Sequence, residues 1–355
     1  MPRNAPFDGS RVSPHSTTEA PMIQQRSKSW LDSVQEKIID PDRRIIDAHH
    51  HLWRTGIIYQ VEDLWGDTQT GHNIQKTVFV DCHAEYRATG PEHLKCLGET
   101  EFVVEQARRS EAGKNGAAVV AAIVSSADLT LGDAVGEVLD QHIALGQGRF
   151  RGIRLAAARD PNPESLMLPG PAPEGLYRMP TFRRGVKALG DRGLTYDAWH
   201  YHHQNRDFLE LARAVPSTQM VLDHFGTPLG VGRYASQREE IFQQWQADIR
   251  EIARCDNVVA KLGGLSMPDN GFGWHQRDTA PTSDEFVSAQ RRYFTHVIEC
   301  FGPDRCMFAS NFPVDKLSIS YSVLLNGIKK IVAGFSDDEK DAMLYRTAAR
   351  IYRSH

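Results

Sequence analysis

Three consecutive histidines, His49, His50 and His51, are the residues whose type and spacing point most clearly to chemistry. They lie in residues 45–53, with apolar residues on both sides. Alternate side chains of an extended strand share a face, so His49 and His51 are predicted to point the same way and His50 the opposite way. Two adjacent imidazoles at a strand end suit a pair of metal ligands or an acid/base pair. The flanking apolar residues favour a buried strand over a histidine-rich surface loop.

Further polar residues interrupt other apolar segments that are predicted to be strands. By segment they are Asp81, Cys82 and His83 in 76–83, Arg154 in 150–157, Asp197, His200, His202 and His203 in 194–204, Asp223 and His224 in 219–225, Lys261 in 257–262, and Ser310 and Asn311 in 305–312. Histidines at the ends of several strands are much stronger evidence for a site than one histidine alone.

The order of the elements predicts the fold class. With residues 117–124, the apolar segments number eight, and segments with helical spacing alternate with them, which is typical of a parallel α/β sheet. Eight units predict a closed (β/α)8 TIM barrel, whose active site lies at the C-terminal ends of the strands. An open doubly wound sheet is the competing fold, but it usually has a glycine-rich turn where this chain has histidines.

The chain is predicted to consist of an N-terminal tail or arm with a short helix (1–40) and a barrel with C-terminal helices (41–355). Helices are expected at 27–39, 283–301 with Ser283 as N-cap, 321–333, and 337–352 with Ser336 as N-cap. Long irregular stretches at 54–75, 159–178 and 266–282 are expected to be loops that shape substrate choice.

Composition limits the class of protein. The 355 residues are 41% hydrophobic and 24% charged, as in ordinary globular proteins, and the formal charge of −4 gives no sign of nucleic-acid binding. No apolar run reaches the roughly 18–20 residues needed to cross a membrane. Five cysteines without a CxxC pair indicate reduced thiols and a cytoplasmic protein. The expected partner is a small-molecule substrate, and a homodimer is compatible with the N-terminal arm.

Three motifs together resemble the amidohydrolase superfamily, in its amidohydrolase-related (amidohydrolase 2) branch. They are residues 46–53 (IDAHHHLW), 221–228 (VLDHFGTP) and 307–314 (MFASNFPV). Within that branch the chain is similar to sugar-lactone and dicarboxylate-lactone hydrolases. The resemblance spans residues 45 to about 352.

This resemblance implies roles for particular residues. His49 and His51 match the histidine pair that holds a metal, which implies one divalent ion, most simply Zn²⁺. His202 best matches the histidine of strand five, with His200 and His203 as alternatives, and His224 matches that of strand six. The carbamylated lysine of two-metal relatives would end strand four, where this chain has none, so a binuclear site is not expected.

Asn311 is the main departure from the family pattern. The family usually has an aspartate here, in a Ser-Asp-Trp-Pro pattern, whereas this chain reads Ser310-Asn311-Phe312-Pro313. An asparagine can position a water but has no basic oxygen at neutral pH. Either a histidine transfers the proton, or Asp315 does, or the chemistry differs. Lactones are easier to hydrolyse than amides, because an alkoxide leaves more easily than an amine. Lactone hydrolysis without a metal is therefore also compatible with this sequence.

Most of the remaining candidates have two interpretations. Arg154 could bind a substrate carboxylate or pair with an acid inside the barrel. Cys82 could touch substrate or be an inert buried thiol. Trp53 and Tyr201 could line the pocket or simply pack. Asp223 could orient a histidine, and Lys261 could face the pocket.

The resulting hypothesis is a hydrolase that opens a lactone of a small organic or sugar acid, with His202, His224 and Asn311 as catalytic residues. One alternative is a non-oxidative decarboxylase of an aromatic or unsaturated acid on the same fold. The other is a barrel that binds a metabolite without catalysis.

Overall fold

Eight parallel strands form a ring in a computed structural model that describes residues 26–114 and 116–354. Each strand pairs with the next in chain order. The strands are β1 (Arg44–His50), β2 (Asn73–Val80), β3 (Val119–Ser125), β4 (Phe150–Ile153), β5 (Thr195–Ala198), β6 (Met220–Leu222), β7 (Val258–Leu262) and β8 (Cys306–Phe308).

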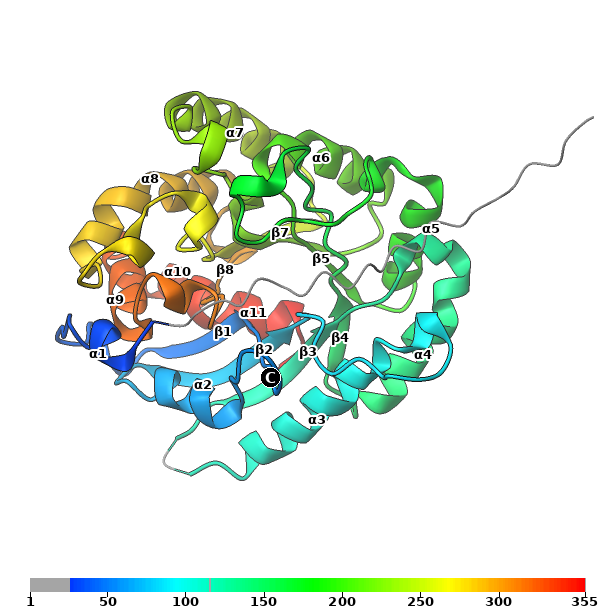
Figure 1. Cartoon of the computed structure of the whole chain (residues 1–355), viewed down its shortest axis with the longest axis horizontal. Helices are drawn as coiled ribbons and strands as arrows, with labels where there is room; N and C mark the ends of the chain where they lie inside the picture. The colour runs from blue at the N-terminus through cyan, green and yellow to red at the C-terminus, as the bar shows by residue number, and fades with distance from the viewer. Residues whose placement is uncertain (1–25, 115, 355) are drawn as a thin grey trace, which may run out of the picture.

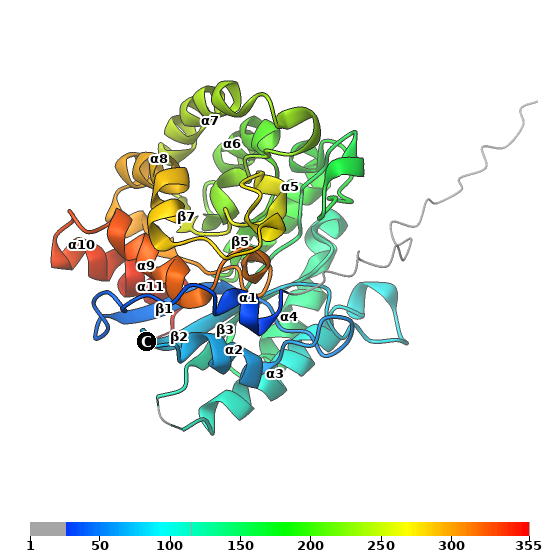
Figure 2. The ribbon, with the colours of Figure 1, turned by 60° about the vertical axis from the view of Figure 1, so that its left-hand side comes forward.

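Helices lie around the outside of the ring, apart from the last one, which packs against its interior (Figures 1 and 2). They are α1 (Lys28–Leu31), α2 (Val61–Thr68), α3 (Leu97–Glu111), α4 (Gly136–Leu145), α5 (Pro180–Gly190), α6 (Asn205–Ala214), α7 (Arg238–Ala253), α8 (Ser283–Phe301), α9 (Tyr321–Ile331), α10 (Asp337–Asp341) and α11 (Thr347–Ile351). This is the predicted (β/α)8 barrel.

Backbone hydrogen bonds close the ring just beyond β8. The amide of Asn311 donates to His49 O (2.8 Å), and the amide of His51 donates to Phe312 O (2.8 Å). The β1–β2 register shifts between Asp47 and His50. A bulge at the rim of a barrel re-aims the side chains that follow it. The closure therefore brings the ends of β1 and β8, with their polar side chains, together.

Apolar side chains from six strands fill the inside of the ring and pack against α11. They are Ile46, Ala48, Val78, Val80, Ala122, Val124, Val221, Val259 and Met307, in contact with Ala348, Ala349, Ile351 and Tyr352. The interior is a packed core, as in other barrels of this size. In both views α11 lies beside β1.

The predicted helix at 27–39 is largely wrong, because only α1 forms. The segment after α1 is instead held by the barrel's outer surface, where Ser283 N donates to Glu36 Oε1 (2.8 Å) and Ile39 N donates to Asn326 Oδ1 (3.0 Å). These tertiary bonds replace the helical ones. Residues 1–25 lie outside the described residues, so the predicted tail and the boundary at residue 40 stay predictions.

Three further expectations need correction. The stretch 54–75 contains α2, which begins with a reciprocal cap between Gln60 and Asp63 and buries Val61 and Leu64. The N-cap of α8 is Thr282, whose hydroxyl accepts from Glu285 N. The helix expected at 337–352 is divided into α10, a π-helical turn at Ala342–Arg346, and α11. No helix within the described ranges is both long and apolar enough to cross a membrane.

Candidate active site

His224 and Asn311 follow their strands in left-handed backbone, with φ of 51° and 59°. Non-glycine residues rarely adopt this conformation, and the strain it stores is concentrated at functional sites. β6 and β8 are accordingly shorter than predicted, because the chain leaves the ladder before these residues. The left-handed turns aim both side chains from the ends of their strands.

His49, His51 and Asn311 form the centre of the site. His49 Nε2 lies 3.3 Å from His51 Nε2, as the strand alternation predicts, and His51 Nε2 lies 3.2 Å from Asn311 Oδ1. His51 Nδ1 lies 2.8 Å from the carbonyl of Val80, so its proton is assigned to Nδ1 and its Nε2 has a free lone pair.

His224 joins this group from β6. Its ring centroid lies 4.5 Å from that of His49. Its Nδ1 lies 3.3 Å from the carbonyl of Gly263, so Nδ1 carries the proton and Nε2 is free to accept one. Side chains from β1, β6 and β8 thus meet in one buried basin.

A buried charged cluster supports the basin. Lys261 Nζ lies 2.7 Å from Asp197 Oδ2, 3.0 Å from Asp223 Oδ1 and 3.2 Å from His49 Nδ1. The hydroxyl of Tyr352 donates to Asp197 Oδ2 (2.5 Å) from the C-terminal side of the chain. Lys261, expected to face the pocket, and Asp223, expected to orient a histidine, are therefore neighbours of His49.

The basin keeps its histidines neutral at neutral pH. Burial lowers the pKa of His224 to about 4, with Lys261 and Arg154 acting in the same direction and Asp223 opposing them. Burial and the Lys261 ammonium hold the pKa of His49 well below its usual value. Burial would raise the pKa of Asp223, but Lys261 and His49 outweigh it and keep this carboxyl ionised. Neutral imidazoles can donate, accept or ligate.

Asp315 lies behind Asn311 and is fully buried. It accepts from Asn311 Nδ2 (2.8 Å) and from Ser266 N (3.0 Å), which directs Asn311 Oδ1 toward His51. Burial raises the pKa of Asp315 to about 7, and the hydrogen bonds from Asn311 and Ser266 only partly oppose this. Asp315 therefore orients Asn311.

Replacing Asp315 by Asn is expected to flatten the pH dependence of stability. The folded carboxyl binds its proton more tightly than the unfolded one, so the stability it contributes is present below about pH 4 and is lost as the pH rises toward 7. One such linked proton changes the free energy of unfolding by about 1.4 kcal/mol per pH unit. Thermal unfolding between pH 5 and 8 measures this, with the exposed Asp278→Asn as control. Equal slopes in both variants contradict the expectation.

Arg154 lies in the same basin and is 8% exposed. It donates to the backbone carbonyl of Asp81, its Nε lies 3.5 Å from Asp81 Oδ2 without a hydrogen bond, and its guanidinium lies 5.7 Å from the Trp199 ring. Burial is the largest cause of the lowered pKa of His51, and the positive charge of Arg154 is the second largest. It therefore pairs with an acid and still has donor capacity toward the basin.

Trp53 and Cys82 lie at the ends of β1 and β2. The Trp53 ring is tilted against His51, with 5.3 Å between centroids, and its Nε1 donates to Cys82 O (3.3 Å). The Cys82 thiol donates to Leu52 O (3.4 Å), and burial together with Glu99 raises its pKa well above the usual value. Trp53 thus contacts a central histidine, whereas the Cys82 thiol is protonated.

No contact of the three histidines after β5 with His49, His51 or His224 is recorded among the described residues, although the Asp223 carboxylate acts on His200. His202 Nδ1 accepts from Leu229 N (3.2 Å), and His203 is exposed. His200 uses both ring nitrogens, with Asn205 and Tyr177. The expected strand ends at Ala198, so these residues occupy a turn.

Tyr201 also contacts the loop rather than the basin. Its hydroxyl donates to Leu168 O and accepts from Gly170 N (3.1 Å), and its ring is fully buried in a separate cluster with Leu229 and Tyr234. These bonds attach the loop at 159–178 to the turn after β5.

Two glycines after β7 are essential to the geometry and were missed in the sequence. A Cβ on Gly264, which has a φ of +83°, would lie 1.9 Å from His224 Nδ1. A Cβ on Gly263 would lie 1.7 Å from Ala309 O. The Gly263-Gly264 pair directly after the lysine strand was the available signal, since adjacent glycines mark a close approach of backbone.

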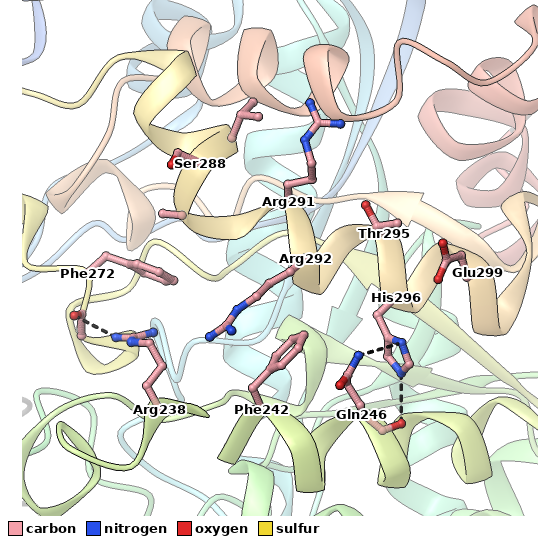
Figure 3. Close-up of a pocket in the computed structure, with 13 residues that line it drawn as sticks. Arg238, Phe242, Gln246, Phe272, Ser288, Arg291, Arg292, Thr295, His296 and Glu299 are labelled. Carbon is pink, nitrogen blue, oxygen red and sulfur yellow. Dashed lines mark hydrogen bonds between the residues drawn. The ribbon is translucent and has the colours of Figure 1, made fainter. Parts of the chain in front are cut away.

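An open groove of about 930 Å³ lies on the outside of the barrel, between α7 and α8 (Figure 3). Two of its three arginines have partners: Arg238 donates to Gly271 O (2.9 Å), and Arg292 pairs with Glu239 (2.7 Å). None of its lining residues belongs to the basin. The chemistry therefore lies at the strand ends and not in this groove.

The basin residues fit a divalent cation. Tetrahedral ligands about 2.0–2.1 Å from Zn²⁺ lie roughly 3.3–3.4 Å apart, close to the 3.3 Å and 3.2 Å separations around His51 Nε2. Two lone pairs, on His51 Nε2 and Asn311 Oδ1, face each other and require a cation or a proton donor between them. A second group of ligand atoms, from His49, Asp223 and His224, lies within 4.8 Å of one another.

Comparison with known proteins identifies the family. The amidohydrolase family model Amidohydro_2 matches residues 46–354. The uncharacterised protein y4mH of Sinorhizobium fredii is 33% identical over 335 residues, which cover 88% of this chain and 99% of that protein. The L-fucono-1,5-lactonase of Burkholderia multivorans is 29% identical over 173 residues, 48% of this chain and 55% of the lactonase.

Solved structures agree in fold. An amidohydrolase from Burkholderia multivorans with bound zinc has a TM-score of 0.67 at 22% identity, covering 88% of this chain and 99% of that one. A putative 2-pyrone-4,6-dicarboxylic acid hydrolase from Pseudomonas putida has a TM-score of 0.57 at 17% identity, covering 88% and 98%. A dihydroxybenzoic acid decarboxylase from a Polaromonas species with bound manganese has a TM-score of 0.54 at 10% identity, covering 88% and 97%.

The family model spans the barrel from β1 to the end of α11 and includes each strand end that contributes to the basin. This chain belongs to the amidohydrolase family.

Proposed function

We propose that this amidohydrolase opens a lactone of a small organic or sugar acid by hydrolysis. The observation that carries the proposal is the basin itself, where His49, His51, His224 and Arg154 meet beside Asn311 instead of a carboxylate. This set can handle an ester whose alkoxide leaves readily, since it has hydrogen-bond donors and a proton acceptor but no acidic ligand at the end of β8. The lactonase named among the relatives supports the same substrate class.

The residues would divide the reaction as follows. Water adds to the lactone carbonyl carbon, His224 Nε2 accepts its proton, and a donor on His49 stabilises the oxyanion. The ring C–O bond then breaks, and the proton passes to the departing alkoxide, which gives a hydroxy acid. Asn311 Oδ1 positions the attacking water, and Arg154 binds an acidic group of the substrate.

A divalent ion, when bound, would supply Lewis-acid polarisation of the carbonyl. His49 and His51 would hold it together with Asn311, or His49 with Asp223 and His224. Zn²⁺ is the ion that suits imidazole ligands. The five cysteines are all free, which suits the reducing cytoplasm in which we propose the enzyme works.

The test is turnover of a substrate panel by chelator-treated and by metal-supplemented protein. The panel holds sugar 1,4- and 1,5-lactones and lactones with a free carboxylate, and acid release is measured with a pH indicator. Hydroxybenzoates are included, with carbon dioxide as the readout. Acid release supports the proposal. Release of carbon dioxide alone indicates a decarboxylase, and tight binding without turnover indicates a metabolite-binding barrel.

Arg154→Met is expected to raise KM for carboxylate-bearing lactones by about 10- to 100-fold, because a charge-assisted hydrogen bond of roughly 1.5–3 kcal/mol is lost. KM for neutral lactones should change little. Steady-state kinetics of both substrate types measure the difference. Arg292→Met, in the outer groove, is the control. An equal effect on neutral and acidic lactones would show that Arg154 serves the structure and not the substrate.

A further inference from the structure

Lys261 makes three short contacts, of which those with Asp197 and His49 are hydrogen bonds and the one with Asp223 is an ion pair. Its side chain is fully buried, and Nζ lies within 3.2 Å of one atom each of Asp197, Asp223 and His49. An ammonium has three N–H donors and no acceptor. His49 Nδ1 is therefore the acceptor in its contact with Lys261, which assigns the His49 proton to Nε2.

The neighbouring contacts agree with this assignment. His51 carries its proton on Nδ1, because Nδ1 lies 2.8 Å from Val80 O. Its Nε2 can then accept from His49 Nε2 at 3.3 Å. The donors run in one direction, from Lys261 to His49, from His49 to His51, and from His51 to the backbone of β2. Each contact in this series therefore has one donor and one acceptor.

Metal binding requires the opposite arrangement. For His49 Nε2 to act as a ligand, the proton must move to Nδ1, where it would face the Lys261 ammonium at 3.2 Å. The acceptor on that side is Asp223 Oδ1, 3.7 Å from His49 Nδ1. Both carboxylate oxygens of Asp223 lack a hydrogen bond in the described part of the chain. Asp223 thus favours the His49 tautomer with the proton on Nδ1, and Lys261 favours the one with the proton on Nε2. Lys261 is the nearer of the two to His49 Nδ1, at 3.2 Å against 3.7 Å.

We propose that Lys261 is a positioning residue that keeps the His49 proton on Nε2, so that His49 donates a hydrogen bond, to His51 or to a substrate in its place, and is a weak ligand for divalent cations. The inference deepens the metal part of the proposed function and does not depend on the substrate. Lys261 therefore sets how far the site relies on metal.

Nitrogen NMR of the wild-type protein with labelled histidine tests the proton position directly. The ring of His49, assigned by the loss of its signals in His49→Ala, should show protonated Nε2 and unprotonated Nδ1. A proton on Nδ1 overturns the proposal. This readout needs no turnover, so it separates failure of the inference from failure of the lactonase proposal.

Lys261→Met should move the His49 proton to Nδ1 and tighten Zn²⁺ binding at least about tenfold, measured by competition with a chromophoric chelator. Lys329→Met is the matched control, because Lys329 Nζ also donates to an imidazole, His72 Nδ1 at 2.9 Å, outside the basin. Unchanged Zn²⁺ affinity in folded Lys261→Met contradicts the proposal. If that variant does not fold, the double variant Lys261→Met with Asp197→Asn removes one charge of each sign, and its Zn²⁺ affinity is measured instead. In either case the NMR spectrum of the wild-type protein shows where the His49 proton lies.

Discussion

His224→Ala is expected to lower kcat/KM for lactone hydrolysis by about a thousandfold, within the 10²–10⁴ range of a general acid–base residue. The mutation removes the imidazole whose Nδ1 is held by Gly263 O and whose Nε2 is free to accept the water's proton. His49→Ala should cause a loss of similar size, because it removes the oxyanion donor. Initial rates on the best lactone of the panel, with circular dichroism to confirm folding, measure both.

The control for these variants is His296→Ala. His296 is also a buried histidine, but it lies on α8 and bonds to Gln246 O (3.0 Å) beside the outer groove. Its loss should leave kcat/KM within about twofold, because it lies outside the basin and away from the chemistry. Full activity in both His224→Ala and His49→Ala would exclude the mechanism proposed for the basin.

Gly264→Ala is expected to abolish activity nearly as completely as His224→Ala. The new Cβ would lie 1.9 Å from His224 Nδ1, and the φ of +83° already disfavours any side chain. His224 must move, and its bond to Gly263 O is then lost. Backbone strain alone costs on the order of 1–3 kcal/mol, so the melting temperature should also fall. The measurement combines lactonase kinetics with thermal unfolding.

Gly273→Ala separates strain from displacement. Gly273 also has a left-handed backbone, with a φ of +71°, but no atom lies within 4 Å of the Cβ it would gain. It should lose stability and retain activity. If Gly264→Ala retains activity while both variants lose similar stability, His224 has either kept its place or does not take part in the reaction.

The two glycine variants also show how the site is built. His224 lies between a backbone that cannot carry a side chain and the imidazole of His49. Interiors are close-packed, so a displacement of about 1 Å here has no free space to absorb it. Precise placement of a few side chains is what allows a barrel to catalyse one reaction.

The sequence by itself determined the barrel and the central pair of the site. Alternation along residues 45–53 placed His49 and His51 on one face, because side-chain direction in a strand is a local property with period two. Apolar segments alternating with helically spaced ones predicted eight βα units, because strand and helix spacing are also local properties of the sequence. Asn311 could also be located from sequence, since its motif lies at the end of a recognisable strand.

Only the tertiary structure decided which histidines and charges meet. His200, His202 and His203 follow one short strand, and the partners of His200 and His202 are Tyr177, Asn205 and Leu229, which no local pattern predicts. Asp197 on β5, Asp223 just after β6 and Lys261 on β7 come from neighbouring strands, but they reach His49 on β1 only because the sheet closes into a ring. The residues after α1 likewise do not form the predicted helix, and they are held by hydrogen bonds to α8 and α9 instead. Contacts between distant segments depend on how the chain closes on itself, and that information is absent from any short stretch of sequence.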